Sequence, residues 1–146
     1  MIKVNLVAIG KLKETFFTDA VNEYAKRISR FASFKVTELP ERKTLSEEAD
    51  DILKKASGLL FVFDVKGEEV TSEGLAKLIE NAATNGKSEL TFVIGSSEGL
   101  DDKVKNVANK KISFGRVTYP HQLMRVIAAE QIYRAFTIIN NVTYHK

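Results

Sequence analysis

Two glycine-containing segments hold the residues of this chain that are best suited to contact a ligand. The first is IGSSEGL, residues 94–100, in which Gly95 follows an apolar run and Gly99 precedes a predicted helix. Glycine lets the backbone approach a ligand closely or adopt a positive φ, and a following helix supplies unpaired amides. The segment lacks the three glycines of a dinucleotide loop and the Gly-Lys-Ser/Thr of a phosphate loop. Both a ligand-binding turn of another kind and a plain tight turn remain open.

The second segment is ISFGRVTYPHQLMR, residues 112–125, in which a predicted strand runs into a loop and then into a helix. The loop carries a glycine, two aromatic residues and an arginine, and its length suits wrapping of a flat heterocycle through backbone hydrogen bonds. His121 is a candidate ligand contact, although a histidine near a helix start more often donates a local hydrogen bond. Glu130 and Arg134, further along this helix, have the spacing of a helix-stabilising ion pair.

The residue types exclude several other kinds of catalytic site. The chain has no cysteine, so disulfides and thiolate metal sites are absent, and two histidines argue against a zinc site. No Ser-His-Asp or Cys-His set is recognisable, although Asp64, Glu98 and Asp101 follow predicted strands. The chain ends in VTYHK, residues 142–146, which is either a frayed terminus or a contact segment.

The charge balance permits a polyanionic partner without requiring one. Lys and Arg number 22 against 19 Asp and Glu, a formal net charge of +3. Many of the cations fall in the first quarter of the chain, where a solvated surface is the ordinary explanation. No apolar stretch approaches the roughly 20 residues of a membrane span, and the first residues do not resemble a signal peptide. We therefore expect a cytoplasmic protein without membrane contact.

Hydrophobic patterning predicts alternating strands and helices. Runs of β-branched and aliphatic residues predict strands at 2–9, 34–39, 59–65, 90–94 and 111–114. Helical spacing of apolar residues predicts helices at 15–30, 44–57, 72–83, 100–109 and 120–139. This alternation indicates one α/β domain over residues 1–146, with a mostly parallel sheet and helices on both faces. Ligands of such sheets bind beyond the carboxyl ends of the strands, where both glycine-containing segments lie.

The motifs, taken together and in order, resemble those of the SPOUT methyltransferases. Within that class the chain is similar to the small bacterial enzymes that methylate ring nitrogen three of a pseudouridine in large-subunit ribosomal RNA (methyltransferase H). The resemblance rests on VAIGKLKE (7–14), EYAKR (23–27), TSEGLA (71–76), FVIGSSEGL (92–100), ISFGRVTYPHQLMRV (112–126), AEQIYRAF (129–136) and YHK (144–146). The run from Phe92 through Phe136 is the most specific part.

This resemblance implies a fold and a cofactor that the pattern of residues alone does not reveal. The family implies a carboxy-terminal trefoil knot, whose loops hold S-adenosylmethionine in a bent conformation. Two positions depart from the family pattern: Phe63 stands where relatives usually carry leucine, and Ser96 where many carry a second glycine. The positions implied to bind the cofactor are Phe63, Gly95, Phe114, Gly115, Arg116, Val117, Thr118 and Tyr119.

The resemblance also implies a homodimer in which each site is completed by the partner. The apolar stripe of the last helix is then either core or interface, and its members are Leu123, Ile127, Ile132, Phe136 and Ile139. The tail residues Tyr144, His145 and Lys146 are expected to reach the partner's cofactor. His145 is the expected proton acceptor, with Lys146 or Arg125 as electrostatic help.

Recognition of the ribosome is expected to use the dimer surface, because the chain carries no added RNA-binding domain. The candidate phosphate contacts are Lys11, Lys13, Lys26 and Arg27. Two other functions remain open, namely methylation of tRNA by the same fold and a ribosome-binding role without catalysis. No metal is expected.

Overall fold

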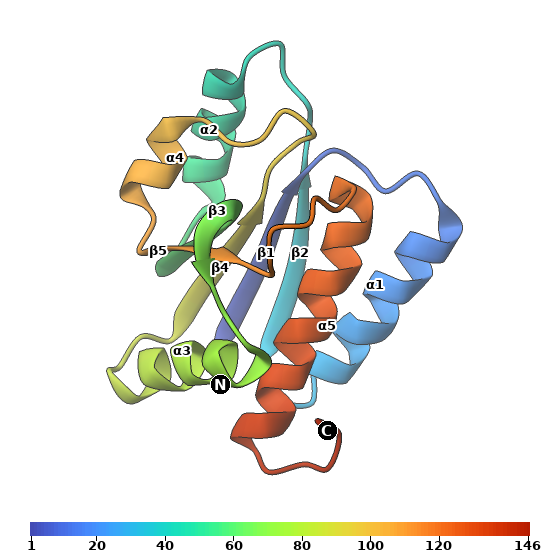
Figure 1. The fold of residues 1–146 in the computed structure, drawn as a ribbon, viewed down its shortest axis with the longest axis vertical. Coiled ribbons are helices and arrows are strands. Elements are labelled where there is room, and N and C mark those ends of the chain that lie inside the picture. Colours follow the sequence, from blue (N-terminus) through green and yellow to red (C-terminus); the bar gives the residue numbers. More distant parts are fainter.

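The computed structural model describes residues 1–146 and contains one five-stranded parallel sheet (Figure 1). The strands are β1 (Lys3–Ile9), β2 (Ser33–Leu39), β3 (Leu59–Glu69), β4 (Glu89–Ile94) and β5 (Lys110–Ser113). Their order across the sheet is β2-β1-β4-β3-β5, and every neighbouring pair is parallel. The predicted α/β fold with a parallel sheet is therefore confirmed.

Helices cover both faces of the sheet, because side chains alternate between its two faces along each strand. Along β1, Val4, Leu6 and Ala8 join one apolar core, while Val7 and Ile9 join the other. The first core packs against α1 (Thr15–Ile28), α3 (Ser72–Thr84) and α5 (His121–Ile139). The second core packs against α2 (Leu45–Lys55) and α4 (Asp102–Val107). None of these helices is long and apolar enough to cross a membrane.

Side-chain caps begin three of the five helices. The hydroxyls of Thr44 and Thr71 accept hydrogen bonds from the backbone amides of Glu47 and Gly74, and Asp101 accepts one from the amide of Lys103. In contrast, α5 begins after Pro120 and has no side-chain cap. The amides of its first turn therefore remain available to other acceptors.

Strand β3 is longer than predicted and continues to Glu69, past the expected end at residue 65. Its pairing with β5 shifts register between Phe63 and Glu68, so the strand bends at Gly67 and then pairs again with Ile112 and Ser113. A Cβ at Gly67 would lie 2.7 Å from the backbone carbon of Lys111. Only glycine allows this close approach. In the sequence, however, a glycine after an apolar run indicates a turn as readily as a continuing strand, so the extension of β3 was not predicted.

Arg125 ties α5 to the carboxyl ends of β1 and β2. Its guanidinium has no exposed surface, donates from Nη1 to Oε2 of Glu38 at 2.7 Å, and donates from Nη2 to the carbonyl of Gly10 at 3.1 Å. Burial lowers the pKa of Arg125, while the facing carboxylate of Glu38 acts in the opposite direction. The start of α5 is thereby held at the edge of the sheet where the strands end.

Replacing this buried cation should destabilise the fold. Arg125→Met keeps much of the apolar volume but removes the cation paired with Glu38, which keeps only the amide of Leu12 as donor, and the donor to the Gly10 carbonyl, so we expect the free energy of unfolding to fall by about 3 kcal/mol. Urea unfolding followed by circular dichroism measures this change. The control is Arg116→Met, whose side chain is 93% exposed, and it should change stability by less than about 1 kcal/mol. Equal stabilities of the two variants would contradict the structural role of Arg125.

Candidate active site

A cavity of 640 Å³ lies beyond the carboxyl ends of β3, β4 and β5. This is the position at which open parallel sheets bind their ligands. Its walls are the segments 63–65, 94–100, 112–115 and 117–121, together with Lys105 and Met124. Both glycine-containing segments identified from the sequence therefore meet around one space.

Seven of the eight predicted cofactor positions line this cavity. They are Phe63, Gly95, Phe114, Gly115, Val117, Thr118 and Tyr119. Arg116 is the exception, because its side chain points to solvent and lies 3.7 Å from a carboxylate oxygen of Glu69. Arg116 thus belongs to the predicted loop, but its side chain does not line the cavity.

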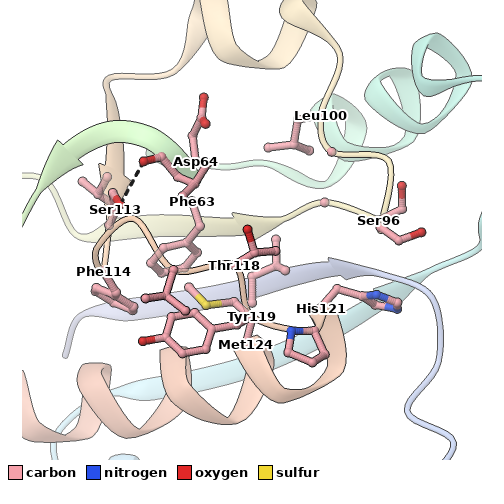
Figure 2. A pocket seen from close by; sticks show the side chains of 18 of the residues that line it. Phe63, Asp64, Ser96, Leu100, Ser113, Phe114, Thr118, Tyr119, His121 and Met124 are labelled. Carbon is pink, nitrogen blue, oxygen red and sulfur yellow. Dashed lines mark hydrogen bonds between the residues drawn. The ribbon is translucent and has the colours of Figure 1, made fainter.

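One end of the cavity is built from aromatic rings. The ring of Phe63 lies between Phe92, at 5.9 Å between centroids, and Phe114, at 5.1 Å. Figure 2 shows Tyr119 and Met124 beside the same end. Phe92 is fully buried, so its packing holds the Phe63 ring in place. Such a surface suits a flat, apolar heterocycle.

The loop that contains Gly95 is packed too closely for any larger residue. A Cβ at Gly95 would lie 2.5 Å from the carbonyl oxygen of Gly99. The turn is closed by a hydrogen bond from the amide of Gly99 to the carbonyl of Ser96 at 2.9 Å, and Gly99 has a φ of +93°. The backbone at this end of the cavity is therefore set by two glycines.

Ser113 fixes the loop that follows β5, a role that sequence reasoning missed. Its Oγ accepts a hydrogen bond from the amide of Gly115 at 3.1 Å and lies 2.7 Å from the carbonyl of that residue. The same Oγ lies 3.3 Å from the carbonyl of Val65, which links the ends of β5 and β3. A serine directly before Phe-Gly at a strand end was the available signal.

Asp64 and Lys105 add a charged pair to the cavity wall. Their side chains lie 3.4 Å apart. Partial burial opposes ionisation of Asp64, but the hydrogen bond from the amide of Lys66 and the cation of Lys105 outweigh it and lower the pKa of Asp64. The carboxylate is thus charged and already neutralised within the chain.

Arg125 lies outside the cavity, although its neighbour Met124 lines it. The buried contacts with Glu38 and Gly10 occupy its guanidinium, so the chain gives it a structural task. Arg125 was expected to assist the reaction electrostatically. Its side chain does not line the cavity, so the structure gives no support to a direct contact with a ligand there.

The carboxy-terminal tail is docked on the far end of α5. The hydroxyl of Tyr144 donates to Oε1 of Glu130 at 2.9 Å, and its ring packs on Tyr133 and under the Arg134 guanidinium. Burial and the Glu130 carboxylate raise the pKa of Tyr144 to about 12. The predicted ion pair between Arg134 and Glu130 is formed at 2.8 Å and supports this contact. The tail is therefore an ordered segment.

His145 has both ring nitrogens engaged in this docked tail. Nδ1 lies 3.1 Å from Nη1 of Arg134, and Nε2 lies 3.1 Å from Oε1 of Glu73. Because arginine only donates, Nδ1 must accept, and the hydrogen of Nε2 then faces the Glu73 carboxylate. No lone pair of His145 is free here. The predicted role as proton acceptor therefore requires these contacts to change.

The tail lies far from the cavity of its own chain. The cavity surrounds the first turn of α5, while the tail contacts Glu130, Tyr133 and Arg134 in the second half of this 19-residue helix. At 1.5 Å per residue, Glu130 lies about 14 Å along the helix from His121. The tail itself lies beside the lower part of α5 in Figure 1. Lys146 is exposed and forms no ion pair within the chain.

The four basic candidates for RNA contact form two separate groups at opposite ends of α1. Lys11 and Lys13 are exposed or partly exposed in the loop before the helix, where the amide of Lys13 donates to Gln122 of α5 at 3.2 Å. Lys26 and Arg27 lie in the last turn, where Arg27 is paired with Glu23 at 2.8 Å. The first group adjoins the first turn of α5, which borders the cavity, whereas Arg27 lies over the ring of Tyr133 further along the same helix.

The chain holds no group of three or more His, Cys, Asp or Glu side chains arranged to bind a metal ion. The cavity instead combines an aromatic end, turns with close backbone packing, and the uncapped start of a long helix. These features suit an organic ligand with a flat ring.

Comparisons with known proteins match this geometry. Residues 2–145 fit the family described as "Predicted SPOUT methyltransferase". This chain belongs to the SPOUT methyltransferase family. Proteins named "Ribosomal RNA large subunit methyltransferase H" from Limosilactobacillus fermentum and Streptococcus pneumoniae are 46% and 45% identical over 159 aligned positions, which cover 99% of this chain and 100% of each relative. The resemblance stated from the motifs is therefore confirmed.

A solved structure shows the same fold at low sequence identity. It is described as "a probable methylase family protein from Haemophilus influenzae Rd KW20", and it superposes with a TM-score of 0.56 at 13% identity. The match covers 99% of this chain and 70% of that protein. Membership in the family implies S-adenosylmethionine as cofactor, and the aromatic end of the cavity fits its adenine ring.

The glycine packing predicts a specific loss of cofactor binding. In Gly95→Ala the new methyl group collides with the Gly99 carbonyl, so the loop must shift and the affinity for S-adenosylhomocysteine should fall at least about tenfold, or 1.4 kcal/mol. Isothermal titration calorimetry measures this affinity. Gly74→Ala, in α3 and away from the cavity, should bind as the wild type does. Wild-type affinity in Gly95→Ala would show that this loop does not shape the cofactor site.

Proposed function

We propose that this chain uses S-adenosylmethionine to methylate ring nitrogen three of a pseudouridine in large-subunit ribosomal RNA, on the assembled ribosome in the cytoplasm. The observation that carries the proposal is the cavity at the ends of β3, β4 and β5, in a SPOUT chain whose relatives are named for ribosomal RNA methylation. The aromatic rings of Phe63 and Phe114 in the cavity wall support a cofactor with a flat nucleobase. Residues 1–146 act as one domain.

The proposal includes a trefoil knot in the carboxy-terminal part of the chain. Support comes from the path of the backbone after β5. The loop at residues 114–120 shares the cavity wall with residues 63–65 of β3 and with the segment that follows β4, and the chain then returns as α5 to pack with α1 and α3 (Figure 1). Threading of this loop between the two strand ends would fix the curvature of the cavity.

The bound cofactor would supply an electrophilic methyl group on a sulfonium. The chain's own contribution is orientation: Phe63 and Phe114 clamp the adenine, and the Gly95 loop holds the other end near Ser96 and His121. Alignment of two reacting atoms in such a site contributes about 7–11 kcal/mol in well-oriented cases. The Asp64–Lys105 pair keeps the rim charged without adding net charge.

The position of the tail supports the homodimer that we propose. The tail is docked on the second half of α5 and does not line the cavity of its own chain, so we propose that it assists the cavity of a second copy. Ile132 and Phe136 are buried in the core, and Ile139 packs against it. Leu123 and Ile127, one turn apart, are partly exposed and belong to neither core. We propose that these two residues lie in the interface, together with Val117, which is 67% exposed.

Mixed dimers test whether the tail acts in the partner's site. One subunit carries Gly95→Ala, and the other lacks residues 144–146. If the tail of each chain completes the other chain's cavity, the mixed dimer contains one intact combination and should regain activity that both parent homodimers lack. Differently tagged subunits, purified together and assayed for methyl transfer, give this measurement. An inactive mixed dimer that still binds cofactor would show that the tail acts in the cavity of its own chain, and an active homodimer without residues 144–146 would show that the tail has no role.

A panel of RNA substrates tests the function itself. Intact ribosomes, separated subunits, naked ribosomal RNA and tRNA are each incubated with radiolabelled S-adenosylmethionine, and the modified nucleoside is identified by mass spectrometry. Methylation of ribosomal pseudouridine on intact ribosomes is expected. Methylation of tRNA would favour the tRNA alternative. Binding to ribosomes without cofactor uptake would favour a non-catalytic ribosome-binding protein.

The basic residues give the panel its control. The double variant Lys11→Glu, Lys13→Glu should retain cofactor affinity, because neither residue lines the cavity. Its binding to ribosomes should weaken, and the slope of log affinity against log salt should flatten by roughly two, because each phosphate neutralised by a cation adds about 0.9 to that slope. An unchanged slope would remove these lysines from the RNA interface.

A further inference from the structure

We propose that His121 accepts the imide proton of the target base during methyl transfer. This inference rests on the proposed function and assigns to the cavity's own histidine the task that the sequence suggested for His145. His121 is the first residue of α5 and lines the cavity. Figure 2 shows its imidazole near Ser96, at the end opposite Phe114. A base bound beyond the cofactor's reactive carbon would meet this end.

The imidazole of His121 has no hydrogen-bond partner within the chain, whereas both ring nitrogens of His145 have one. Its ring forms no hydrogen bond with any other residue of the chain and is partly exposed to the cavity. A neutral imidazole therefore offers one lone pair and one N–H to a ligand. In His145, one ring nitrogen contacts Arg134 and the other contacts Glu73. The chain has only two histidines, so the geometry separates a docked one from an available one.

Other titratable groups around the cavity are less suited to the task. Glu98 is an exposed carboxylate on the Gly95 loop, and the Tyr119 side chain lies at the aromatic end of the cavity, opposite His121. Asp64 is paired with Lys105. The charged residues on the neighbouring loop and on the strand ends beside α5 are Lys11, Lys13, Glu14, Glu38 and Glu41. Glu38 is already held by Arg125.

The start of α5 supports the same step electrostatically. As the proton leaves, negative charge develops on the ring nitrogen and its two flanking carbonyl oxygens. The first turn of α5 has no side-chain cap, so its amides and the positive end of the helix dipole lie beside His121. Donors fixed toward developing charge stabilise a transition state more than they do a neutral ground state.

The step balances in atoms and electrons. The nitrogen–hydrogen bond of the base breaks, its proton moves to a ring nitrogen of His121, and its electron pair stays on the base nitrogen. That nitrogen forms a bond to the methyl carbon, while the carbon–sulfur bond breaks and its electron pair returns to sulfur. The products are the methylated base, neutral S-adenosylhomocysteine and an imidazolium, which releases its proton to water.

The two histidines provide a matched pair of variants. Single-turnover methylation of ribosomes with saturating cofactor is followed between about pH 5 and pH 9, a range that spans the ordinary imidazole pKa near 6.5. In His121→Gln the rate should fall about 100-fold or more and lose its rise with pH, while affinity for S-adenosylhomocysteine stays close to that of the wild type. In His145→Gln the rise with pH should remain, even if the rate is lower.

Chemical rescue gives a second measurement that does not depend on the glutamine variant. Free imidazole should restore methylation by His121→Ala, more so with more basic imidazoles, and should not restore His145→Ala. The proposal is overturned if His121→Gln keeps the pH rise, if it loses cofactor affinity in proportion to rate, or if only His145→Ala is rescued. Lack of cofactor binding in the wild type would instead overturn the proposed function.

Discussion

The buried guanidinium of Arg125 is the interaction on which the geometry of the cavity depends. It joins α5 to Glu38 of β2 and to the carbonyl of Gly10 after β1, so the first turn of the long helix is fixed against the strand ends. A buried cation is costly unless it is paired, and the contacts of Nη1 and Nη2 with Glu38 and Gly10 therefore favour one position of this turn, although the buried Nε has no partner. The loop at residues 114–120 must then span the distance from β5 to that fixed point. Its curvature around the ligand space follows from both anchors.

Hydrophobic periodicity predicted every strand and helix because most elements bury one side or both. The continuous apolar run LLFVFDV predicted a buried strand, and β3 is indeed sandwiched between β4 and β5. Helix ends that are set by side-chain caps, such as the start of α2 after Thr44, can also be recognised from the sequence, because the capping residue is local. The extension of β3 to Glu69 was not, because it depends on the close approach of Gly67 to Lys111 of another strand. The distance between two strands cannot be inferred from the local sequence of either one.

The parts of the candidate site that are formed by the backbone could be predicted from the sequence. The parts that depend on where a side chain points could be predicted less well. Gly95, Phe114 and Gly115 follow strands, and parallel topology brings strand ends together whatever the details of packing. Arg116 and Arg125 show the limit, since an arginine in a motif faces either a ligand or an internal carboxylate. In each case the partner, Glu69 or Glu38, lies many residues away and only the folded chain reveals it. The docking of His145 on Glu73 was hidden for the same reason.

The first turn of α5 borders the cavity, and the second half of the same helix binds the tail. This separation favours a dimer in which the tail of one copy approaches the cavity of the other. The uncapped amino-terminal end borders the cavity, while Glu130 and Arg134 in the second half of the helix hold the tail. Because an α-helix is rigid, the docked tail stays separated from the first turn of its own α5. A two-fold pairing through Leu123 and Ile127 would set the helices side by side in opposite directions and carry each tail toward the other cavity. In such a dimer the contacts of Tyr144 with Glu130 would hold the tail in place, while those of His145 would have to change before it could act.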